Sequence, residues 1–340
     1  MWMVTGGAGY IGSHIVRALQ ADGQRVVVVD DLSTGLTSRV PSNTQLEVFS
    51  LLDTKQLARV MRDLHVTGVV HLAAKKAAGE SVDEPVYYYY ENIGGMISLL
   101  RAMEAAGVQK LVYSSSAAVY GEPVDDAPLT EDSRTEPTNP YGATKLIGER
   151  MVRDAAAPLG LSWAALRYFN VAGCGADDLA DTSAFNLIPM VLRAHAAGKS
   201  PKIFGTDYPT PDGTCIRDYI HVQDLAEAHV AACRLVSGDL SAAGPAAAEA
   251  RAADGRIEAV LNIGTGRGSS VREVLASVSA ALGEELDAEE TDRRPGDPSL
   301  LAANASKAAA VLGWTSRQDL DDMTTSAVSG MSWLKANGYL

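Results

Sequence analysis

Short apolar runs alternate with helical patterns along the first half of this 340-residue chain. Each apolar run has the length of a single strand, and the segments between the runs read as helices. Such βα alternation predicts an α/β fold with a parallel, doubly wound sheet. The predicted strands are Trp2–Thr5, Arg25–Asp30, Gln45–Phe49, Gly68–Leu72, Lys110–Ser114 and Ser162–Tyr168, and the predicted helices are Ile11–Ala21, Thr54–Leu64, Asn92–Ala106 and Tyr141–Ala157.

The pattern becomes less regular after about Asn170. Asn186–Ala197 predicts a helix, Pro201–Gly213 a loop-rich segment, and Val260–Ile263 a short strand that could rejoin the sheet. Ser237–Arg256 is rich in alanine and has no apolar periodicity. We therefore expect Ser237–Arg256 to be a mobile surface insertion without a functional role.

This change of pattern divides the chain into two predicted domains. The first, residues 1–169, holds the parallel sheet. The second, residues 170–340, is smaller and mixed, with parts near 214–232 and 258–264 returning to the first domain. Ligands bind such sheets at the carboxyl ends of the strands, so chemically active residues should lie directly after strands.

A glycine-rich loop follows the first strand. Gly6-Gly7-Ala8-Gly9-Tyr10-Ile11-Gly12 leads into a predicted helix, which is the context that a Rossmann-type dinucleotide site requires. Glycines let the backbone approach a pyrophosphate, whose charge meets the helix N-terminus. Asp30 and Asp31 end the next strand, where a carboxylate accepts ribose hydroxyls and repels a 2′-phosphate. The predicted cofactor is therefore NAD rather than NADP.

Tyr141 and Lys145 are four residues apart, directly after Asn139-Pro140. A proline at the first helical position starts a helix, so both side chains should share one face near its N-terminus. A nearby cation and the helix terminus would lower the tyrosine pKa from its usual value of about 10. The pair is thus a candidate general base with its supporting cation.

Ser116 is a candidate partner of this pair. It follows Ser114-Ser115 at the end of a predicted strand, where its hydroxyl should point toward the same crevice. In that position Ser116 could hydrogen-bond a substrate hydroxyl that undergoes chemistry.

Acidic residues outnumber basic ones. The 42 Asp and Glu against 29 Lys and Arg give a formal net charge of −13. A field of this sign repels nucleic acid and anionic membrane surfaces, so neither is an expected partner. An anionic small ligand would need local groups such as helix N-termini or single arginines.

The cysteines point to a reducing compartment. Cys174, Cys215 and Cys233 are widely spaced and odd in number, and no pair has metal-ligand spacing. We expect buried small side chains rather than nucleophiles, and no metal site. No apolar run is long enough to span a bilayer, and a strand at Trp2 leaves no room for a signal peptide. These features predict a cytoplasmic protein.

The glycine loop, Ser116 and Tyr141-x-x-x-Lys145 together resemble the extended short-chain dehydrogenase/reductase superfamily. Further motifs resemble the UDP-glucose 4-epimerase family over essentially the whole chain. The stretch Asp207–Asp224 is the most specific part, because related sugar-nucleotide enzymes differ there. The motifs are Leu166–Asn170, Asn186–Pro189, Phe204–Thr210, Arg217–Asp224 and Arg293–Asp297.

The resemblance implies reversible epimerisation of UDP-galactose and UDP-glucose at C4, through a transient 4-keto sugar and with bound NAD. It implies that Tyr141 is the general base and acid, that Lys145 binds the nicotinamide ribose and lowers the Tyr141 pKa, and that Ser116 orients the 4-oxygen. It also implies a homodimer formed through helices of the cofactor domain, with Asn92–Ala106 and Tyr141–Ala157 as candidates.

The same resemblance assigns binding residues. For the cofactor they are Gly6, Gly9, Tyr10, Ile11, Gly12, Asp30, Asp31, Leu32, Leu51, Leu52, Leu72, Ala73, Ala74, Lys76, Asn92, Ser114, Tyr141, Lys145 and Tyr168. For the UDP-sugar they are Lys76, Ser116, Ala117, Ala118, Tyr141, Phe169, Asn170, Asn186, Leu187, Lys202, Ile203, Phe204, Arg217, Tyr219, Arg294, Asp297 and Leu301.

Three positions depart from the family pattern. Leu51 stands where the family usually has an aspartate that contacts adenine, with Asp53 two residues later, so NAD would be held less tightly. Leu72 replaces a frequent phenylalanine. Leu301 aligns with the position that sets the room for the sugar 2-substituent, and its bulk predicts a preference for glucose and galactose over N-acetyl sugars.

Alternatives remain within and outside this superfamily. A 4,6-dehydratase would need acidic residues after the serine, where Ala117 and Ala118 stand. A UDP-glucuronate 4-epimerase or decarboxylase would need a further group for the sugar carboxylate, which we do not identify in the sequence. A non-enzymatic NAD-responsive regulator could dispense with Ser116, Tyr141 and Lys145, and all three are present.

Overall fold

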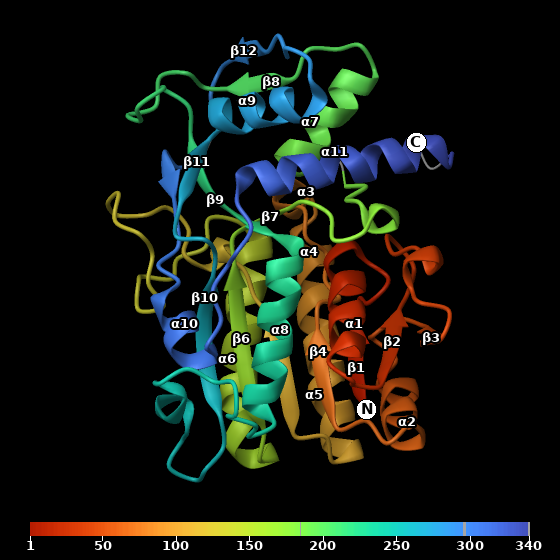
Figure 1. Ribbon diagram of the computed structural model, residues 1–340. Coiled ribbons are helices and arrows are strands. Elements are labelled where there is room, and N and C mark those ends of the chain that lie inside the picture. Colours follow the sequence, from red (N-terminus) through yellow and green to blue (C-terminus); the bar gives the residue numbers. More distant parts are fainter. Residues whose placement is uncertain (184, 295–296, 339–340) are drawn as a thin grey trace.

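A computed structural model describes residues 1–183, 185–294 and 297–338 of the chain (Figure 1). It confirms the α/β class: within these residues, seven parallel strands form the central sheet in the order β10-β6-β5-β4-β1-β2-β3. The strands are β1 (Trp2–Thr5), β2 (Val26–Asp30), β3 (Gln45–Val48), β4 (Gly68–His71), β5 (Lys110–Ser114), β6 (Ser162–Tyr168) and β10 (Glu258–Ile263).

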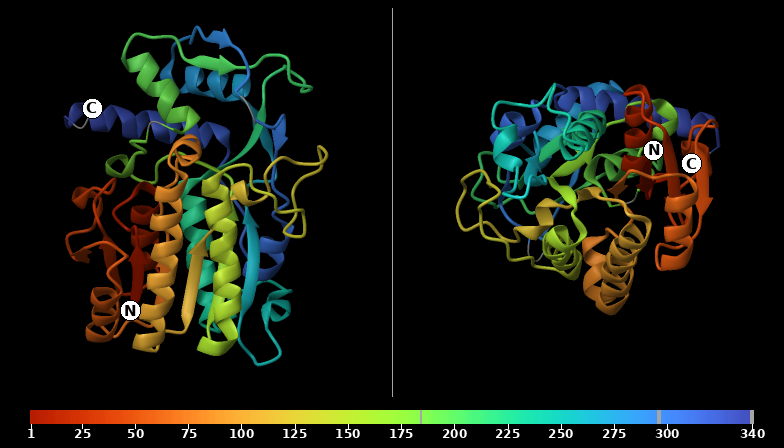
Figure 2. Two further views of the ribbon diagram at one scale, coloured as in Figure 1. Left: turned by 180° about the vertical axis from the view of Figure 1, so that it is seen from behind. Right: turned by 90° about the horizontal axis from the view of Figure 1, so that it is seen from below.

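Helices cover both faces of this sheet and bury its apolar side chains. One face packs against α1 (Tyr10–Ala21), α8 (Val222–Val236) and α10 (Ser306–Leu312). The other packs against α2 (Thr54–Asp63), α5 (Gly94–Ala106) and α6 (Pro140–Leu159), of which α5 and α6 lie side by side in the rear view of Figure 2. Strands covered on both sides read as continuous apolar runs, which is why the sequence revealed them.

A smaller part lies beyond the carboxyl ends of the strands, at the top of Figure 1. Its strands are β7 (Asn170–Ala172), β8 (Lys202–Phe204), β9 (Ile216–His221), β11 (Gly268–Ser270), β12 (Glu289–Thr291) and β13 (Leu300–Leu301). Its helices are α7 (Leu187–Ala196), α9 (Val271–Leu282) and α11 (Leu320–Ala336), which share a separate apolar core. Parallel and antiparallel pairs occur together here, with β9 parallel to β7 and β13 and antiparallel to β11.

The predicted elements are present, with boundary shifts of one or two residues for most of them. The helix predicted to begin at Asn92 starts earlier, because α4 (Pro85–Tyr88) and a π-helical turn (Tyr89–Ile93) lead directly into α5. A further helix, α3 (Ala78–Asp83), precedes α4. The segment predicted as loop-rich contains the short strand β8.

The predicted surface insertion at Ser237–Arg256 is exposed along most of its length, but two of its residues are buried, which the sequence did not indicate. Its 3-10 helix, η5 (Ala247–Ala250), buries Ala247 and Ala250 in the same apolar core as α8 and α10. The backbone N–H groups of Gly244 and Ala246 donate to carbonyl oxygens of α10. The segment has no sequence periodicity because only a few small side chains face the core, so burial depends on a partner far along the chain.

Two elements from the second half of the chain, a strand and a helix, pack with the central sheet. β10 pairs with β6 in parallel from Glu258–Trp163 to Ile263–Tyr168, as the sequence suggested. Helix α8 packs against α1, β5 and β6. Each of the three cysteines is buried and free, as expected. In the described part of the chain, no helix is both long and apolar enough to cross a membrane.

Candidate active site

The loop between β1 and α1 leaves no space for side chains at two of its glycines. Gly6 has φ +72°, and a Cβ atom there would lie 2.8 Å from the backbone nitrogen of Ala73. A Cβ atom on Gly12 would lie 2.1 Å from the carbonyl oxygen of Gly6. Gly9 is the N-cap of α1 and has no side chain that could cover the N–H groups of the first turn. This cradle fits a pyrophosphate, as NAD binding requires.

Asp30 is buried beside this loop at the end of β2. Its Oδ2 accepts the N–H of Ala8 at 3.0 Å and its Oδ1 accepts the N–H of Leu32 at 2.9 Å. Burial raises the pKa of this carboxyl, and the two backbone bonds oppose the shift. A carboxylate oxygen can accept a second hydrogen bond, so Asp30 can shape the loop and receive a ribose hydroxyl. Asp31 next to it is exposed.

The segment after β3 presents apolar side chains where the family has a carboxylate. Leu51 packs at the edge of the apolar core under α5, and the side chain of Leu52 approaches Gly94 of that helix. Asp53, two residues later, caps α2 by accepting the N–H of Gln56 at 3.0 Å. The adenine end of the predicted site is therefore bounded by leucines.

Asn92 holds the loop after β4 against α6. Its Oδ1 accepts the N–H of Lys75 at 2.8 Å, and its Nδ2 donates to the carbonyl oxygen of Lys75 and to the hydroxyl of Thr144. Asn92 thus fixes the stretch that holds the predicted cofactor residues Leu72, Ala73, Ala74 and Lys76. Lys76 is exposed, while the ammonium of Lys75 donates to Ser33.

Tyr141 and Lys145 lie on one face of α6, near its N-terminus. Asn139 caps the helix by accepting the N–H of Gly142, and Pro140 is its first residue. The Lys145 Nζ atom is 5.9 Å from the centre of the Tyr141 ring and donates to the carbonyl oxygen of Ser114 at 2.8 Å. Two further ammonium hydrogens can serve a ligand. The predicted pair is therefore brought together beside the end of β5.

Ser116 completes the group at the end of β5. It is the N-cap of the 3-10 helix η3 (Ala117–Val119), and its Oγ accepts the N–H of Ala118 at 3.2 Å. Burial raises the pKa of Tyr141, and the nearby Ser116 hydroxyl opposes that rise. A hydroxyl and a phenol placed close together can share one substrate oxygen.

The expected lowering of the Tyr141 pKa is wrong for the polypeptide by itself. Burial raises the pKa of Tyr141, and the hydrogen bond from Ser116 only opposes that change. Burial has the opposite effect on Lys145, whose pKa it lowers to about 8, and the carboxylate of Glu149 opposes this decrease. Desolvation disfavours the charged form of each side chain.

Ser114 and Tyr168 lie behind this group. The Oγ of Ser114 is 2.9 Å from Nε2 of His229 on α8, and burial raises the pKa of Tyr168 well above its usual range. His229 is fully buried, and the Tyr168 ring lies 6.2 Å from the His229 ring. These side chains pack behind Tyr141, Lys145 and Ser116.

Charged side chains gather where β8, β9 and β13 meet. The guanidinium of Arg294 lies 3.8 Å from the centre of the Phe204 ring. Arg217 donates to the carbonyl oxygens of Ile216 and Pro298 and pairs with Asp297 at 3.5 Å. Guanidinium groups pair with phosphate oxygens, so Arg217 together with Arg294 on its aromatic neighbour suits a nucleoside diphosphate. Pro295 and Gly296 of the same motif lie outside the described residues.

Other predicted substrate residues come from the junction of the two parts of the chain. Phe169 and Ala117 are buried in one small apolar cluster that Leu301 borders, whereas Asn170 is exposed at the start of β7. Tyr219 is buried, and burial raises the pKa of its phenol to about 12.

Two predicted substrate residues are engaged with protein partners. Asn186 is the N-cap of α7, next to Leu187, and donates to Asp181 at 2.7 Å. Lys202 pairs with Glu289 at 3.5 Å, whereas Ile203 beside it is buried. A ligand would have to compete with these contacts or share them.

Sequence reasoning missed a buried ion pair behind the catalytic group. Glu149 on α6 and Arg167 on β6 bond through two N–H groups, at 2.9 and 2.7 Å. A signal was present in the sequence, because Glu149 follows Lys145 by one helical turn. His229 had no such signal, since only folding brings α8 to β5.

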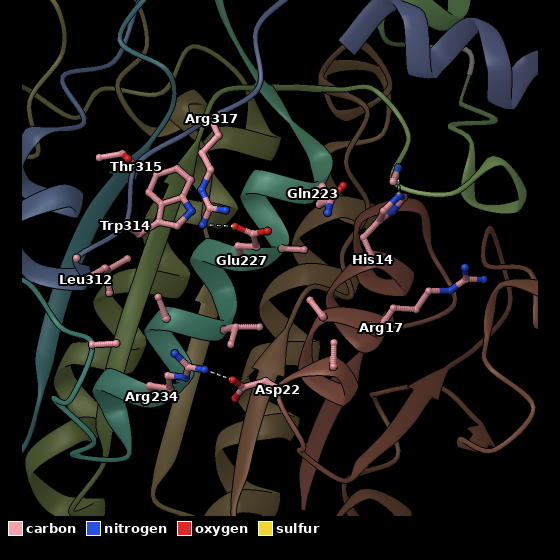
Figure 3. Close-up of a pocket in the computed structure, with 18 of the residues that line it drawn as sticks. His14, Arg17, Asp22, Gln223, Glu227, Arg234, Leu312, Trp314, Thr315 and Arg317 are labelled. Carbon is pink, nitrogen blue, oxygen red and sulfur yellow. Dashed lines mark hydrogen bonds and ion pairs between the residues drawn. The ribbon is translucent and has the colours of Figure 1, made fainter. Parts of the chain in front are cut away.

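A groove of about 730 Å³ opens on the other face of the sheet, between α1 and α8 (Figure 3). Its wall includes Trp314, and at its rim Arg234 pairs with Asp22 and Arg317 with Glu227. None of the predicted site residues lines it. The groove is therefore separate from the candidate active site.

Comparison with known proteins places the chain in a family. The model of the NAD dependent epimerase/dehydratase family matches residues 2–242. The chain belongs to this family. It is 45% identical over 335 residues to the UDP-glucose 4-epimerase of Azospirillum brasilense, covering 96% of this chain and 90% of the relative.

Solved structures from the same family share the whole fold. The UDP-glucose 4-epimerase of Stenotrophomonas maltophila, with bound NAD and formylated UDP-arabinopyranose, has a TM-score of 0.89 at 38% identity, with 99% and 98% of the two chains covered. That of Brucella ovis in complex with NAD has a TM-score of 0.88 at 39% identity, with 96% and 97% covered. The resemblance read from the motifs is thereby confirmed.

Proposed function

We propose that this member of the epimerase/dehydratase family is a UDP-glucose 4-epimerase, an isomerase that interconverts UDP-glucose and UDP-galactose with bound NAD. The observation that carries the proposal is the placement of Tyr141 near Lys145 and Ser116 at the end of β5, together with the Gly6–Gly12 loop after β1. The near full-length relatives named UDP-glucose 4-epimerase support the same substrate.

The proposed chemistry needs one group that moves a proton at the sugar 4-oxygen. NAD, when bound, supplies the acceptor and donor of hydride. Tyr141 takes the proton of the 4-hydroxyl, acting as a base. It later returns a proton to the 4-oxygen of the product, whose C4 has the opposite configuration, and so acts as an acid. Ser116 holds the same oxygen through a hydrogen bond. The ammonium of Lys145 stabilises the phenolate and has free donors for a ribose hydroxyl.

The proposed UDP site uses the smaller part of the chain. Arg217 and Arg294 pair with the diphosphate, Phe204 lies beside the uracil, and Asp297 accepts a ribose hydroxyl. The contacts among these side chains support this assignment. We also propose the functional division of the chain after residue 169, with α8 and β10 serving the cofactor domain.

Purified protein incubated with UDP-galactose tests the function. We expect conversion to UDP-glucose without added NAD, because a cofactor that regenerates itself can stay bound. A parallel incubation with UDP-glucuronate separates the main alternative. Conversion of UDP-glucuronate alone would reject the proposal in favour of a glucuronate enzyme, and NAD binding with no turnover of either sugar would favour a regulator.

The side chain of Leu301 is expected to exclude large 2-substituents. It borders the apolar cluster of Ala117 and Phe169, next to the proposed sugar position. Replacing Leu301 by alanine should raise the turnover of UDP-N-acetylglucosamine relative to UDP-glucose by about tenfold, the usual value of small steric changes in a pocket. Competition assays measure this ratio. Equal turnover of both sugars by the unchanged enzyme would contradict the role of Leu301.

A homodimer is proposed through the helices of the cofactor domain. Val86, Tyr90 and Ile97 are 78%, 62% and 45% exposed, and their spacing places them along one face of the continuous α4–α5 helix. Large apolar side chains gathered on a surface mark an interface. Replacing Tyr90 and Ile97 by lysine should shift the mass measured by light scattering from dimer to monomer. Val124→Lys, an exposed loop position, is the control.

A cytoplasmic location is also proposed. It is supported by the three free cysteines, which suit a reducing compartment. Fractionation of cells that express the protein measures it directly.

A further inference from the structure

Glu149 extends the row of catalytic side chains along α6. It follows Tyr141 by two helical turns and Lys145 by one, so all three share a face. Glu149 is 1% exposed and Lys145 is 4% exposed. A carboxylate at this depth needs partners of its own. Glu149 stands on α6 and contacts the segment after β5, and these two elements hold the reacting groups.

Three hydrogen bonds fix the carboxylate. Arg167 on β6 donates through Nε to Oε1 at 2.9 Å and through a terminal nitrogen to Oε2 at 2.7 Å. The hydroxyl of Ser115 donates to Oε1 at 2.5 Å. Ser115 stands between Ser114, whose carbonyl receives the Lys145 ammonium, and Ser116. Glu149 therefore joins α6 to the strand end that aligns Lys145 and Ser116.

Arg167 carries the network further. It donates to the hydroxyl of Tyr120 and to the carbonyl oxygen of Glu131, at 3.1 Å each. Tyr120 in turn donates to Asn262 on β10 at 2.5 Å. These bonds fix the guanidinium on the Glu149 carboxylate. It neutralises the carboxylate in part.

The electrostatic surroundings of Lys145 single out Glu149. The titratable and charged side chains that face this ammonium or its direct contacts are Tyr141 and Glu149 on α6, Tyr113 on β5, His71 on β4, Tyr168 and Arg167 on β6, and His229 on α8. Burial lowers the pKa of His71 to about 3 and that of His229 to about 4, so both are neutral near pH 7. Among these described residues, Glu149 is the carboxylate.

We propose that Glu149 and Arg167 are positioning residues of the active site: Glu149 keeps the Lys145 ammonium charged in its buried place, and Arg167 limits the negative charge that Glu149 presents. The proposal rests on the proposed function for its kinetic readout. Its direct readout, the protonation of Lys145, does not need turnover.

Two single variants should shift this protonation in opposite directions. Glu149→Gln removes the carboxylate, so the titration midpoint of Lys145 falls by about one pH unit, the usual effect of a neighbouring charge. Arg167→Met leaves the carboxylate unneutralised, so the midpoint rises, by a smaller amount. NMR of protein labelled with ¹³C-lysine follows the titration, and the signal lost in Lys145→Arg identifies the residue. In turnover, the pH at which activity declines on the alkaline side should move the same way.

The double variant Glu149→Gln/Arg167→Met guards against a failure to fold. Removing one partner of a buried ion pair is strongly destabilising, because the other charge is left unpaired. Removing both partners leaves no unpaired charge. The double variant should show a downward shift smaller than that of Glu149→Gln. Arg234→Met, which removes an arginine from the α8 surface pair with Asp22, is the matched control and should leave the midpoint unchanged.

These outcomes separate a specific role from a structural one. A purely structural pair would lower activity in both single variants without opposite shifts, and this result would overturn the proposal. An unchanged Lys145 midpoint in the double variant would do the same. If the shifts appear in a protein that turns over no UDP-sugar, the electrostatic role holds and the proposed function fails.

Discussion

Tyr141→Phe is expected to lower the turnover of UDP-galactose at least about a hundredfold, the usual contribution of a general base. Phenylalanine keeps the ring and its packing but cannot exchange a proton with the sugar. The pH profile should reinforce this result. Because burial raises the pKa of Tyr141, activity of the unchanged enzyme should increase with pH on the acid side of the profile, until loss of the Lys145 proton, whose pKa burial lowers to about 8, makes it decline.

The loss must come from the phenol and not from a general effect of removing a hydroxyl. Tyr208→Phe is the matched control, because the Tyr208 hydroxyl is buried without a hydrogen-bond partner in the described part of the chain. NAD bound to each purified variant should stay at the level of the unchanged protein. Near-normal epimerisation by Tyr141→Phe would reject the proposed mechanism.

Gly12→Ala is expected to abolish the retention of NAD. The new Cβ atom would lie 2.1 Å from the carbonyl oxygen of Gly6, where distances below 3.0 Å are essentially never seen. The loop or the start of α1 must then move by roughly 1 Å, a misplacement that can reduce turnover about a hundredfold. Chromatography of the nucleotide released on denaturation measures the bound NAD directly.

A second glycine provides the comparison. Gly79→Ala adds the same methyl group at a position of α3 where nothing lies within 4 Å. It should keep both bound NAD and turnover. A Gly12→Ala enzyme with its full complement of NAD would show that the cradle is wider than the Gly6 contact indicates.

Most of the fold could be predicted from the sequence because the central strands are buried on both faces. β2, for example, begins with four consecutive valines, and β1, β3, β4 and β5 are each followed by helical segments before the next strand. The segment 237–256 could not be predicted. Its burial comes from Ala247 and Ala250, small side chains whose partners in α10 lie far along the sequence.

The candidate catalytic group was predictable for a local reason. Tyr141 and Lys145 share one helix, and Ser116 ends a strand whose carboxyl end must face the crevice. The protonation of Tyr141 was not predictable, because it depends on how deeply folding buries the phenol. The Glu149–Arg167 pair escaped notice for a related reason: its two charges come from different elements, and only the assembled sheet places them in contact.

The last strand of the central sheet is synthesised late. β10 pairs with β6, yet about ninety residues separate Tyr168 from Glu258. At ribosomal speeds this interval lasts roughly 5–20 s, during which one edge of β6 has no partner strand. The part of the chain that is synthesised first therefore exposes one edge of β6, a strand that is buried in the complete fold, until β10 has been synthesised. A fragment that ends at residue 169 would keep that edge open, so we expect it to require a chaperone or to aggregate.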